Sequence, residues 1–415
     1  MKFEDYKFDP KVKQGLEDMG FRRPTDIQYK SIRNIMNGED LLAVAQTGTG
    51  KTAAFAIPMI DMIYRKKKNR KGVNHVTGLV MVPSHELAIQ IEKVFNALAK
   101  HTDIVTIALY GGVDQSPQID ALKKGADIVI ATPGRMFDLI HQGYLETERI
   151  EILVLDEADY MLDLGFKKDI IDILRKLPNR RQTMFFSATI NDKIKKIAYN
   201  IVKQSAIRIQ ISPKDPVARN IEHFVMYVEM DDKRFFLERV INENPESKIL
   251  AFVRTKVRAE RVHKAMERVN IPSLTIHGDK TQEQRTEVLR QFREGETNLL
   301  IGTDVTARGI DIPDITIVIN YDLPDEAENY VHRVGRTGRA KKKGHAYSFC
   351  SKEERPMLEE IQSFLKEEIE VLQIDKLEYS NTLNIEREKK YDYKALIDDI
   401  NNFEATKKKK KRKKK

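Results

Sequence analysis

The segment LLAVAQTGTGKT, residues 41–52, predicts the fold of the first part of the chain. Leu41 to Ala45 form a short apolar run typical of a buried parallel strand, and a helix is expected to begin near Thr52. The small residues between them allow successive backbone N–H groups to surround an anion at a helix N-terminus. Lys51 adds a positive charge, and Thr52 adds a hydroxyl for magnesium. This arrangement predicts a phosphate-binding loop, although Ala45 replaces the glycine that usually begins the pattern.

Short runs rich in Val, Ile and Leu recur between longer amphipathic segments along the whole chain. This alternation predicts parallel strands joined by helices, in two successive α/β units. Segment 211–220 contains two prolines and few apolar side chains, so an extended linker is expected there. The expected strands are 41–45, 78–82, 104–109, 128–131, 152–155 and 183–186 in the first unit, and 224–228, 249–253, 273–276, 299–302, 315–320 and 346–349 in the second.

Composition indicates a protein with a real hydrophobic core. The chain has 415 residues, of which 41% are hydrophobic and 33% charged, so two or three globular domains are expected. No run approaches the roughly 18 uninterrupted apolar residues of a membrane-spanning helix, and the first ten residues lack the apolar stretch of a secretory signal. A cytoplasmic location without a membrane partner is therefore expected. The single cysteine, Cys350, excludes internal disulfides and multi-cysteine metal sites.

The positive charge of the chain is concentrated at its end. The formal net charge is +9, and residues 407–415, KKKKKRKKK, hold nine of the 72 Lys and Arg residues. The rest of the chain has 63 basic and 63 acidic side chains and is formally neutral. The tail is expected to bind polyanions without reading their sequence, unless it is only a solvated end. Any contact of the folded part with nucleic acid must then come from a local arrangement of side chains.

Three carboxylates follow the predicted strand at 152–155, in the sequence DEAD at 156–159. Ligands of open parallel sheets bind at the carboxyl edge where this strand ends. Asp156 is expected to organise magnesium, and Glu157 to orient or deprotonate the water that attacks a γ-phosphate. A solvated acidic loop is the alternative, which the preceding phosphate-binding loop disfavours.

The second unit offers cations in place of a phosphate-binding loop. The segment HRVGRTGR at 332–339 follows TDVTARGIDIP at 303–313. Arg336 and Arg339 are three residues apart, so they can project to one side of a helical turn toward a nucleotide held by the other unit. Both are candidate arginine fingers, and a basic surface turn is the alternative reading.

Eight motifs follow one another in the order of the DEAD-box ATP-dependent RNA helicases of superfamily 2, and the chain resembles this family over about residues 3–375. The resemblance implies an α/β fold of two RecA-like domains, each a mostly parallel β-sheet flanked by helices, joined by a flexible linker. It also implies ATP and Mg²⁺ in the cleft, and RNA lying across both domains. A bacterial origin is suggested by the compact body and the short basic extension. The motifs are GFRRPTDIQ at 20–28, AQTGTGKT at 45–52, GG at 111–112, TPGR at 132–135, DEAD at 156–159, SAT at 187–189, the TD…RG…D stretch at 303–311 and HRVGRTGR at 332–339.

The resemblance divides the chain into five parts. The expected boundaries are an adenine-recognition segment at 1–29, an ATP-binding RecA-like domain at 30–210, a linker at 211–220, a C-terminal RecA-like domain at 221–376 and a charged, disordered extension with the basic tail at 377–415.

Site residues follow from the same resemblance. Gln28 is expected to read adenine, Phe3 to stack on it, and Thr25 to support the phosphate loop. Asp311 is expected to reach the ribose from the second domain. The phosphates and the magnesium are assigned to Ala45, Gln46, Thr47, Gly48, Thr49, Gly50, Lys51 and Thr52, with Thr52 and Asp156 as metal ligands and Lys51, Asp156, Glu157, Arg336 and Arg339 as catalytic residues.

The resemblance also assigns RNA contacts and interdomain coupling. RNA is expected to be held mainly by its backbone, with little sequence preference. One departure is His85, in PSHELA at 83–88, where the family commonly has an arginine beside RNA; weaker or pH-dependent RNA affinity is the expected consequence. The expected RNA contacts are Gly111, Gly112, Thr132, Gly134, Arg135, Arg254, Gly278 and Thr303, and the coupling residues are Asp159, Ser187, Thr189 and His332.

The predicted activity is therefore ATP-dependent RNA unwinding, in which the two domains close over RNA and separate short duplexes. Three alternatives remain at this stage. An ATP-gated RNA clamp or assembly scaffold would carry the same motifs, DNA-directed translocation is less favoured, and a small-molecule kinase shares only the phosphate loop. A monomer is the simplest expectation.

Overall fold

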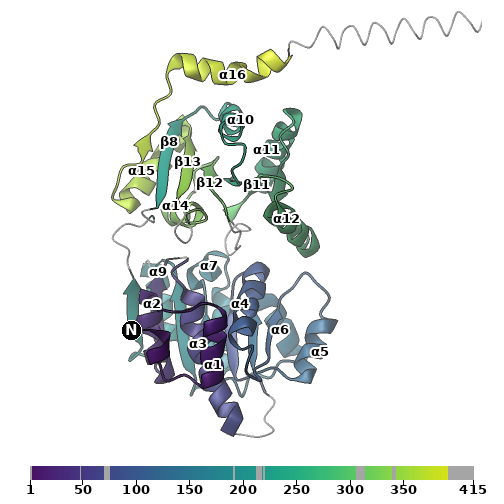
Figure 1. The fold of residues 1–415 in the computed structure, drawn as a ribbon, viewed down its shortest axis with the longest axis vertical. Helices are drawn as coiled ribbons and strands as arrows, with labels where there is room; N and C mark the ends of the chain where they lie inside the picture. The colour runs from purple at the N-terminus through teal and green to yellow at the C-terminus, as the bar shows by residue number, and fades with distance from the viewer. Residues whose placement is uncertain are drawn as a thin grey trace, which may run out of the picture.

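The computed structural model describes residues 2–46, 48–69, 75–189, 192–211, 217, 220–304, 314–338 and 343–390. The chain folds into two α/β units that follow one another along the longest axis of the molecule (Figure 1). Unit 1 contains the strands β1 (Leu41–Ala45), β2 (Gly78–Met81), β3 (Thr106–Leu109), β4 (Ile128–Ala131), β5 (Ile152–Leu155), β6 (Gln182–Ser187) and β7 (Ile207–Ile211). Unit 2 contains β8 (Ile221–Tyr227), β9 (Ile249–Phe252), β10 (Leu274–Ile276), β11 (Leu299–Gly302), β12 (Ile317–Asn320), β13 (Gly344–Cys350) and β14 (Glu370–Val371).

Helices cover both sheets. In unit 1 they are η1 (Phe3–Asp5), α1 (Pro10–Asp18), α2 (Asp26–Met36), α3 (Lys51–Asn69), α4 (His85–Leu98), α5 (Ser116–Lys124), α6 (Pro133–His141), α7 (Ala158–Asp163), α8 (Lys167–Lys176) and α9 (Asp192–Ile201). In unit 2 they are α10 (Lys233–Glu243), α11 (Lys256–Arg268), α12 (Gln282–Glu294), α14 (Ala327–Val334), η2 (Lys352–Glu354), α15 (Arg355–Leu365) and α16 (Lys376–Lys390).

The two sheets have the same topology. Their strand orders are β3-β4-β2-β5-β6-β1-β7 and β10-β11-β9-β12-β13-β8-β14, and each is the other shifted by seven strands. The strand pairs are parallel in both sheets. The carboxyl ends of the strands therefore lie at one edge of each sheet, where ligands of such folds bind. The predicted fold of two RecA-like domains is confirmed.

The expected strands are present, with ends shifted by a few residues, and two strands were missed. The sequence IRIQI of β7 alternates between apolar and polar residues, because β7 is an edge strand whose side chains are only partly buried. Strand β7 therefore contains no continuous apolar run. Strand β14 has two residues and pairs with β8 at the other edge. So short a strand leaves no periodic signal.

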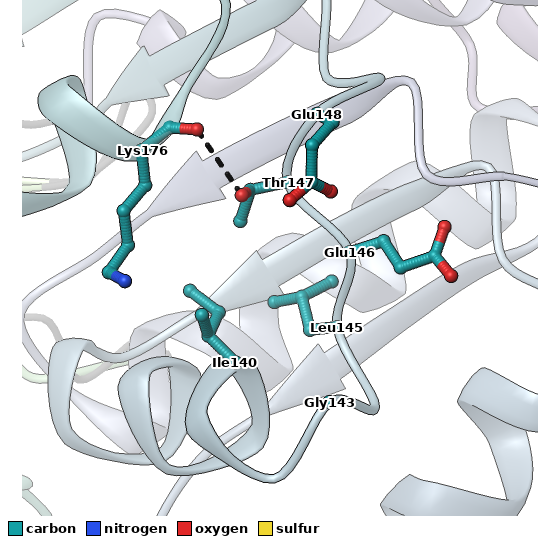
Figure 2. A pocket seen from close by; sticks show the side chains of 7 residues that line it. All are labelled: Ile140, Gly143, Leu145, Glu146, Thr147, Glu148 and Lys176. Carbon is teal, nitrogen blue, oxygen red and sulfur yellow. Dashed lines mark hydrogen bonds between the residues drawn. The ribbon is translucent and has the colours of Figure 1, made fainter.

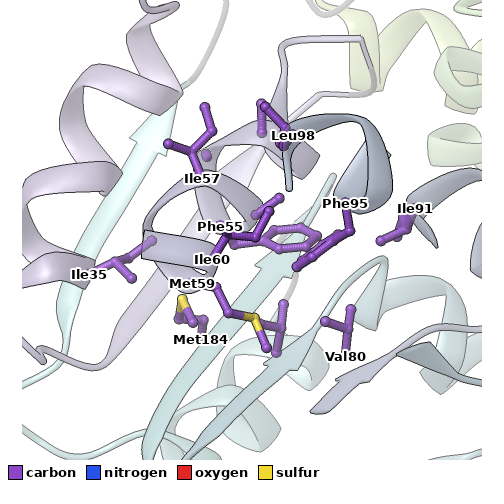
Figure 3. Packing of buried hydrophobic residues seen from close by; sticks show 14 of the residues in the cluster. Ile35, Phe55, Ile57, Met59, Ile60, Val80, Ile91, Phe95, Leu98 and Met184 are labelled. Carbon is purple, nitrogen blue, oxygen red and sulfur yellow. The ribbon is translucent and has the colours of Figure 1, made fainter. Parts of the chain in front are cut away.

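Hydrophobic packing fixes the helices on both faces of each sheet. Neighbouring residues of β6 point to opposite faces, so Phe186 joins the cluster beneath α3 and α4 while Phe185 joins the cluster beneath α6 to α9. In the first cluster the ring of Phe55 lies 6.1 Å from that of Phe95 (Figure 3). The Phe55 ring also lies 5.2 Å from that of Phe186. Helix α3 is buried in this core and carries Lys51 at its first residue. The packing thus holds the phosphate loop against the edge of the sheet.

The expectation of a disordered extension from residue 377 is wrong for its first part, because α16 continues to Lys390 and packs on α10. The Tyr379 hydroxyl donates to Asp232 at 2.8 Å, and its ring lies 5.0 Å from that of Phe236. Glu378 pairs with Arg239. The high charge content of this segment predicted disorder, whereas Tyr379 and Glu378 hold it against α10. Residues 391–415, with the basic tail, and most of the expected linker at 211–220 lie outside the described residues.

None of the helices in the described part of the chain combines the length and apolar character needed to span a lipid bilayer.

Candidate nucleotide and nucleic-acid site

The phosphate loop lies between β1 and α3, as predicted. Gly48 and Gly50 adopt positive φ angles of 79° and 91°, a backbone region that L side chains rarely occupy. The Lys51 ammonium donates to the carbonyl of Ala45 at 2.7 Å, and the Thr49 hydroxyl donates to that of Gln46 at 2.7 Å. These bonds hold the loop at the carboxyl edge, with Thr52 as the second residue of α3. Thr47 lies outside the described residues.

The segment before α2 is tied directly to this loop. The side-chain carbonyl of Gln28 accepts from the backbone N–H of Thr25 at 2.9 Å, and its amide donates to the carbonyl of Gly50 at 3.1 Å. A side chain at Gly50 would collide with the Gln28 amide. Glycine is therefore required here by both φ and space. The support of the loop by this segment has a structural basis, whereas adenine reading by Gln28 stays a prediction.

Phe3 lies in the core of unit 1. Its side chain is 3% exposed, and its ring meets that of Phe21 edge-on at 5.6 Å and lies 6.0 Å from that of Tyr6. Phe8 is buried too, and its ring stacks on that of Tyr6 at 5.2 Å. These contacts anchor the amino-terminal segment, and stacking of Phe3 on adenine stays a prediction.

The carboxylates of the DEAD segment occupy the same edge. Asp156 follows β5 directly and is 3% exposed. Burial raises the pKa of Asp156 to about 7; the Lys51 charge opposes this rise and the Glu157 carboxylate adds to it. Glu157 has a φ of 50° and donates its backbone N–H to the Asp156 carboxylate at 3.0 Å. A left-handed backbone at a non-glycine residue is a strained feature that often marks a functional site.

A magnesium ion fits this edge because Asp156 is a buried carboxylate whose ionised form needs positive charge. In the described ranges no three His, Cys, Asp or Glu side chains are grouped to hold a metal. Mg²⁺ is commonly held by one or two protein oxygens together with substrate phosphates and water.

Asp159 connects the DEAD segment with β6 and with unit 2. Its carboxylate accepts from the backbone N–H of Ala188 at 3.0 Å and from the N–H and hydroxyl of Thr189 at 2.9 and 3.0 Å. Burial alone would raise the pKa of Asp159, but the attraction of His332 and Lys51 and the bonds from Thr189 lower it. His332 belongs to α14 of unit 2, so its charge acts on Asp159 from the other unit, and the coupling role of these residues stays a prediction.

The expectation that Ser187 bonds to the DEAD segment is wrong. Its hydroxyl donates to the carbonyl of Thr189 at 2.6 Å, because β6 ends at Ser187 and the chain turns back over it. Ser187 supports the turn that presents Thr189.

The cationic segment 332–339 of unit 2 begins with His332. Arg336 is 5% exposed, and its Nε donates to the carbonyl of His332 at 3.2 Å. Arg339 and Asp311 lie outside the described residues, so their predicted roles remain predictions.

The predicted RNA residues of unit 1 differ in exposure: Gly112 and Gly134 are exposed, whereas Thr132 and Arg135 are buried. Gly112 has a φ of 74°, and Gly134 has no heavy atom within 4 Å of the position a Cβ would take. Arg135 donates from Nη2 to the carbonyl of Val113 at 2.8 Å, while its Nη1 has no hydrogen-bond partner among the described residues. Thr132 caps α6, and Gly111 lies beside His85. The unpartnered Nη1 of Arg135 is buried in this arrangement.

Unit 2 places its predicted RNA residues differently. Gly278 is open, since a Cβ there would meet no atom within 4 Å, and Thr303 is 8% exposed. Arg254 is already engaged by acceptors. Its Nε lies 3.2 Å from the Asp325 carboxylate, and its Nη2 lies 3.4 Å from that of Glu354.

Two contacts between the units were not predicted from the sequence. His85 Nδ1 lies 3.0 Å from the side-chain oxygen of Gln282, and Arg285 Nη1 lies 3.5 Å from the Glu86 carboxylate. The partners are 197 and 199 residues apart, and no sequence pattern links them. His85, at the place of an expected RNA-binding arginine, thus contacts the other unit.

Arg333 was also missed, although it lies in the quoted segment HRVGRTGR. It is 2% exposed and binds the Asp304 carboxylate with Nε and Nη2, at 2.6 and 2.7 Å. Its Nη1 donates to the carbonyl of Asp322 at 2.6 Å. The sequence did contain a signal for this ion pair, because its carboxylate, Asp304, lies in the quoted segment at 303–313.

A separate pocket of about 360 Å³ lies between the end of α6, the loop after it and the end of α8 (Figure 2). The loop leads into the start of β5, at the sheet edge opposite the phosphate loop. None of the predicted site residues lines it. The lining residues are Ile140, Gly143, Leu145, Glu146, Thr147, Glu148 and Lys176.

Comparisons with known proteins agree with this arrangement. Residues 25–197 match the DEAD/DEAH box helicase model, and residues 232–341 match the helicase conserved C-terminal domain. The chain is 41% identical over 372 residues to the ATP-dependent RNA helicase CshA of Listeria monocytogenes, covering 90% of this chain and 70% of that protein. It is 37% identical over 402 residues to the ATP-dependent RNA helicase RhlB of Shewanella piezotolerans, covering 96% and 88%.

Among solved structures, S. cerevisiae Dbp5 bound to RNA and ADP BeF3 superposes with a TM-score of 0.81 at 29% identity. The superposition covers 95% of this chain and 99% of that chain. A score of this size over both units requires a similar placement of the two sheets as well as a similar fold.

Proposed function

Because the chain belongs to the DEAD/DEAH box helicase family and is an ATP-dependent RNA helicase, we propose which of its residues carry the reaction. The protein binds RNA across its two RecA-like domains and couples ATP hydrolysis to local separation of short duplexes. We assign residues 30–210 and 221–376 as these domains, with 1–29 as the adenine-recognition segment and 211–220 as the linker. We further propose that the protein acts as a monomer in the cytoplasm.

The nucleotide is held by unit 1. Lys51 and the backbone N–H groups of the loop bind the phosphates, and Gln28 and Phe3 bind adenine. Thr52 and Asp156 hold Mg²⁺, which supplies positive charge for the oxygens of the transferred phosphoryl group. Glu157 accepts a proton from the attacking water and orients it. The pKa of Asp156, about 7 without a bound cation, supports this reading, because the buried carboxylate gains most from a neighbouring positive charge.

Unit 2 completes the nucleotide site when the units close. Arg336 and Arg339 stabilise the charge that develops on the γ-phosphate, and Asp311 binds the ribose. His332 attracts the Asp159 carboxylate, which in turn holds Thr189. RNA bridges the same two units, so each ligand favours the closed arrangement and increases the affinity for the other.

RNA lies along the edge formed by both units. Gly111, Gly112, Thr132, Gly134 and Arg135 bind its backbone from unit 1. Closure bends the bound strand in a way that a continuous A-form duplex cannot follow. Each stacked step is worth about 1.4 kcal/mol in DNA and a similar amount in RNA, so one closure opens only a few base pairs. From unit 2 the contacts come from Arg254, Gly278 and Thr303.

The basic tail at 407–415 adds nonspecific RNA affinity by releasing counterions. Deleting these nine residues should weaken RNA binding and flatten its dependence on salt, while RNA-stimulated ATP hydrolysis persists. An unchanged salt slope would show that the tail is only a solvated end.

The observation that carries the proposal is the placement of Lys51 and the buried Asp156 at one edge of unit 1, where His332 of unit 2 attracts the neighbouring Asp159 carboxylate. The test compares Glu157→Gln with the wild type. The variant should retain binding of ATP and RNA while hydrolysis falls roughly 100-fold or more, because the water loses its base. Wild-type turnover would remove the role of Glu157. RNA-stimulated hydrolysis without duplex separation in the wild type would favour an ATP-gated clamp.

A further inference from the structure

Unit 2 contains a counterpart of the ATP site at the same place in its sheet. Because the two sheets have one topology, β8 corresponds to β1, α10 to α3 and β12 to β5. Lys51 is the first residue of α3, and Lys233 is the first residue of α10. Asp156 follows β5, and Asp322 lies two residues beyond β12. The lysine and the carboxylate of the phosphate site are therefore both repeated in unit 2.

The surroundings of the two lysines differ. The loop before Lys51 reads QTGTG, whereas the loop before Lys233 reads VEMDD and has no glycine. Lys233 is fully buried, and its ammonium donates to the Glu354 carboxylate at 2.5 Å and to the carbonyl of Tyr321 at 2.7 Å. It also lies 3.5 Å from the Asp322 carboxylate. The ammonium is thus surrounded by one backbone carbonyl and two carboxylates of the protein itself.

The Glu354 carboxylate occupies a cradle of the kind that binds phosphate. It is 1% exposed and accepts the backbone N–H groups of Leu323 at 3.1 Å and Ser351 at 3.0 Å. Lys233 and Arg254 supply two cations. Inward-pointing N–H groups combined with a lysine at a helix N-terminus are the elements of an anion site.

We propose that the Glu354 carboxylate is a built-in anion that occupies the phosphate position of unit 2, and that the filled site fixes the turn between β9 and α11. Asp322 also holds this turn, through contacts with Arg254 and Arg258. Its carboxylate accepts the backbone N–H of Arg254 at 3.1 Å and pairs with Arg258 at 2.9 Å. Lys233, Asp322 and Glu354 are positioning residues for Arg254, and this last part rests on the proposed contact of Arg254 with RNA.

The first test asks whether an external anion can replace the carboxylate. Truncation by Glu354→Ala leaves both N–H groups and Lys233 without their anion. Inorganic phosphate should raise the melting temperature of this full-length variant by about 3 °C more than it raises that of the wild type, at matched ionic strength in chloride. The matched control is Lys233→Met combined with Glu354→Ala, which removes the cation and should lose the extra shift. Equal shifts in all three proteins would overturn the proposal.

The second test remains informative if the truncated variant does not fold. Glu354→Gln keeps the volume but removes the charge that orders Arg254, so RNA affinity with a non-hydrolysable ATP analogue should fall about tenfold. ATP affinity without RNA should stay within about twofold. Asp325→Asn is the matched control, because Asp325 contacts Arg254 from an exposed position outside the cradle; its RNA affinity should change by less than about twofold.

Unchanged RNA affinity in Glu354→Gln would refute the positioning role. The contact of Arg254 with RNA is tested separately by Arg254→Ala. If this variant binds RNA normally, the proposed contact fails, whereas the phosphate experiment still decides whether Glu354 is a built-in anion.

Discussion

Lys51 and Lys233 begin equivalent helices in two sheets of one topology, yet they serve opposite purposes. Lys51 is 7% exposed and donates one hydrogen bond, to a backbone carbonyl, so its charge remains for a ligand. Lys233 is fully buried and meets two carboxylates. An ion removed from water needs compensation, and unit 2 provides it by direct ion pairs, whereas in unit 1 Asp156 and Asp159 attract Lys51 without a direct ion pair in the described structure. The same fold thus places one lysine where its charge faces a ligand site and the other where two carboxylates of the protein neutralise it.

The largest expected effect comes from removing the available charge. Lys51→Met should lower RNA-stimulated ATP hydrolysis by roughly 100-fold or more, because the lysine stabilises the transferred phosphoryl group. Its thermal stability should change less than that of Lys233→Met, since the ammonium of Lys51 hydrogen-bonds to a backbone carbonyl and attracts Asp156 and Asp159 only through space in the described structure. Steady-state hydrolysis and a melting curve measure both. A melting temperature reduced as strongly as activity would break the contrast between the two lysines.

The reverse pattern is expected for Lys233→Met. Removing one partner of a buried ion pair leaves an uncompensated charge and should destabilise the protein by about 3 to 5 kcal/mol. Denaturant unfolding of unit 2 measures this loss. Adding Glu354→Gln to Lys233→Met should recover part of the stability, because the stranded carboxylate is then neutral. If Lys233→Met is as stable as the wild type, the ion pair of Lys233 and Glu354 does not stabilise unit 2 as proposed.

A smaller effect is expected at the glycine that distinguishes the two loops. Gly50→Ala would strain a residue at φ 91° and displace the Gln28 amide, at a cost of about 1 to 3 kcal/mol. ATP affinity should fall more than stability, because Gln28 joins the adenine segment to the loop. Gly278→Ala is the matched control, since a Cβ there has open space. Wild-type ATP affinity in Gly50→Ala would mean that the loop adapts.

The smallest effect should come from the pair that joins the two halves. Arg285→Ala removes the ion pair with Glu86 and should weaken the mutual enhancement of ATP and RNA binding by about 1 kcal/mol. Each ligand alone should bind as before. RNA titrations with and without an ATP analogue measure the coupling. Adding Glu86→Gln to Arg285→Ala should then cost nothing more, and an additive loss would show that the two side chains act independently.

Local patterns predicted the elements that carry strong signals of their own. The strand before the phosphate loop, Lys51 at the helix start and Asp156 at the strand end lie where they were expected, because buried strands and small-residue loops are encoded within a few neighbouring residues. Strand β7 was missed because its alternating sequence reflects a half-buried edge. The start of the extension was wrongly predicted to be disordered, because Tyr379 stabilises it only through packing on α10.

The sequence by itself determined the two parallel sheets, the phosphate loop and the motif order that identifies the family, since these depend on contiguous residues. Only the tertiary structure decided that His85 meets Gln282, that Ser187 supports Thr189, and that Glu354 neutralises a lysine 121 residues away. Such contacts depend on which loops share a sheet edge and on which charges are buried together. The separation of two residues along the sequence reveals neither of these.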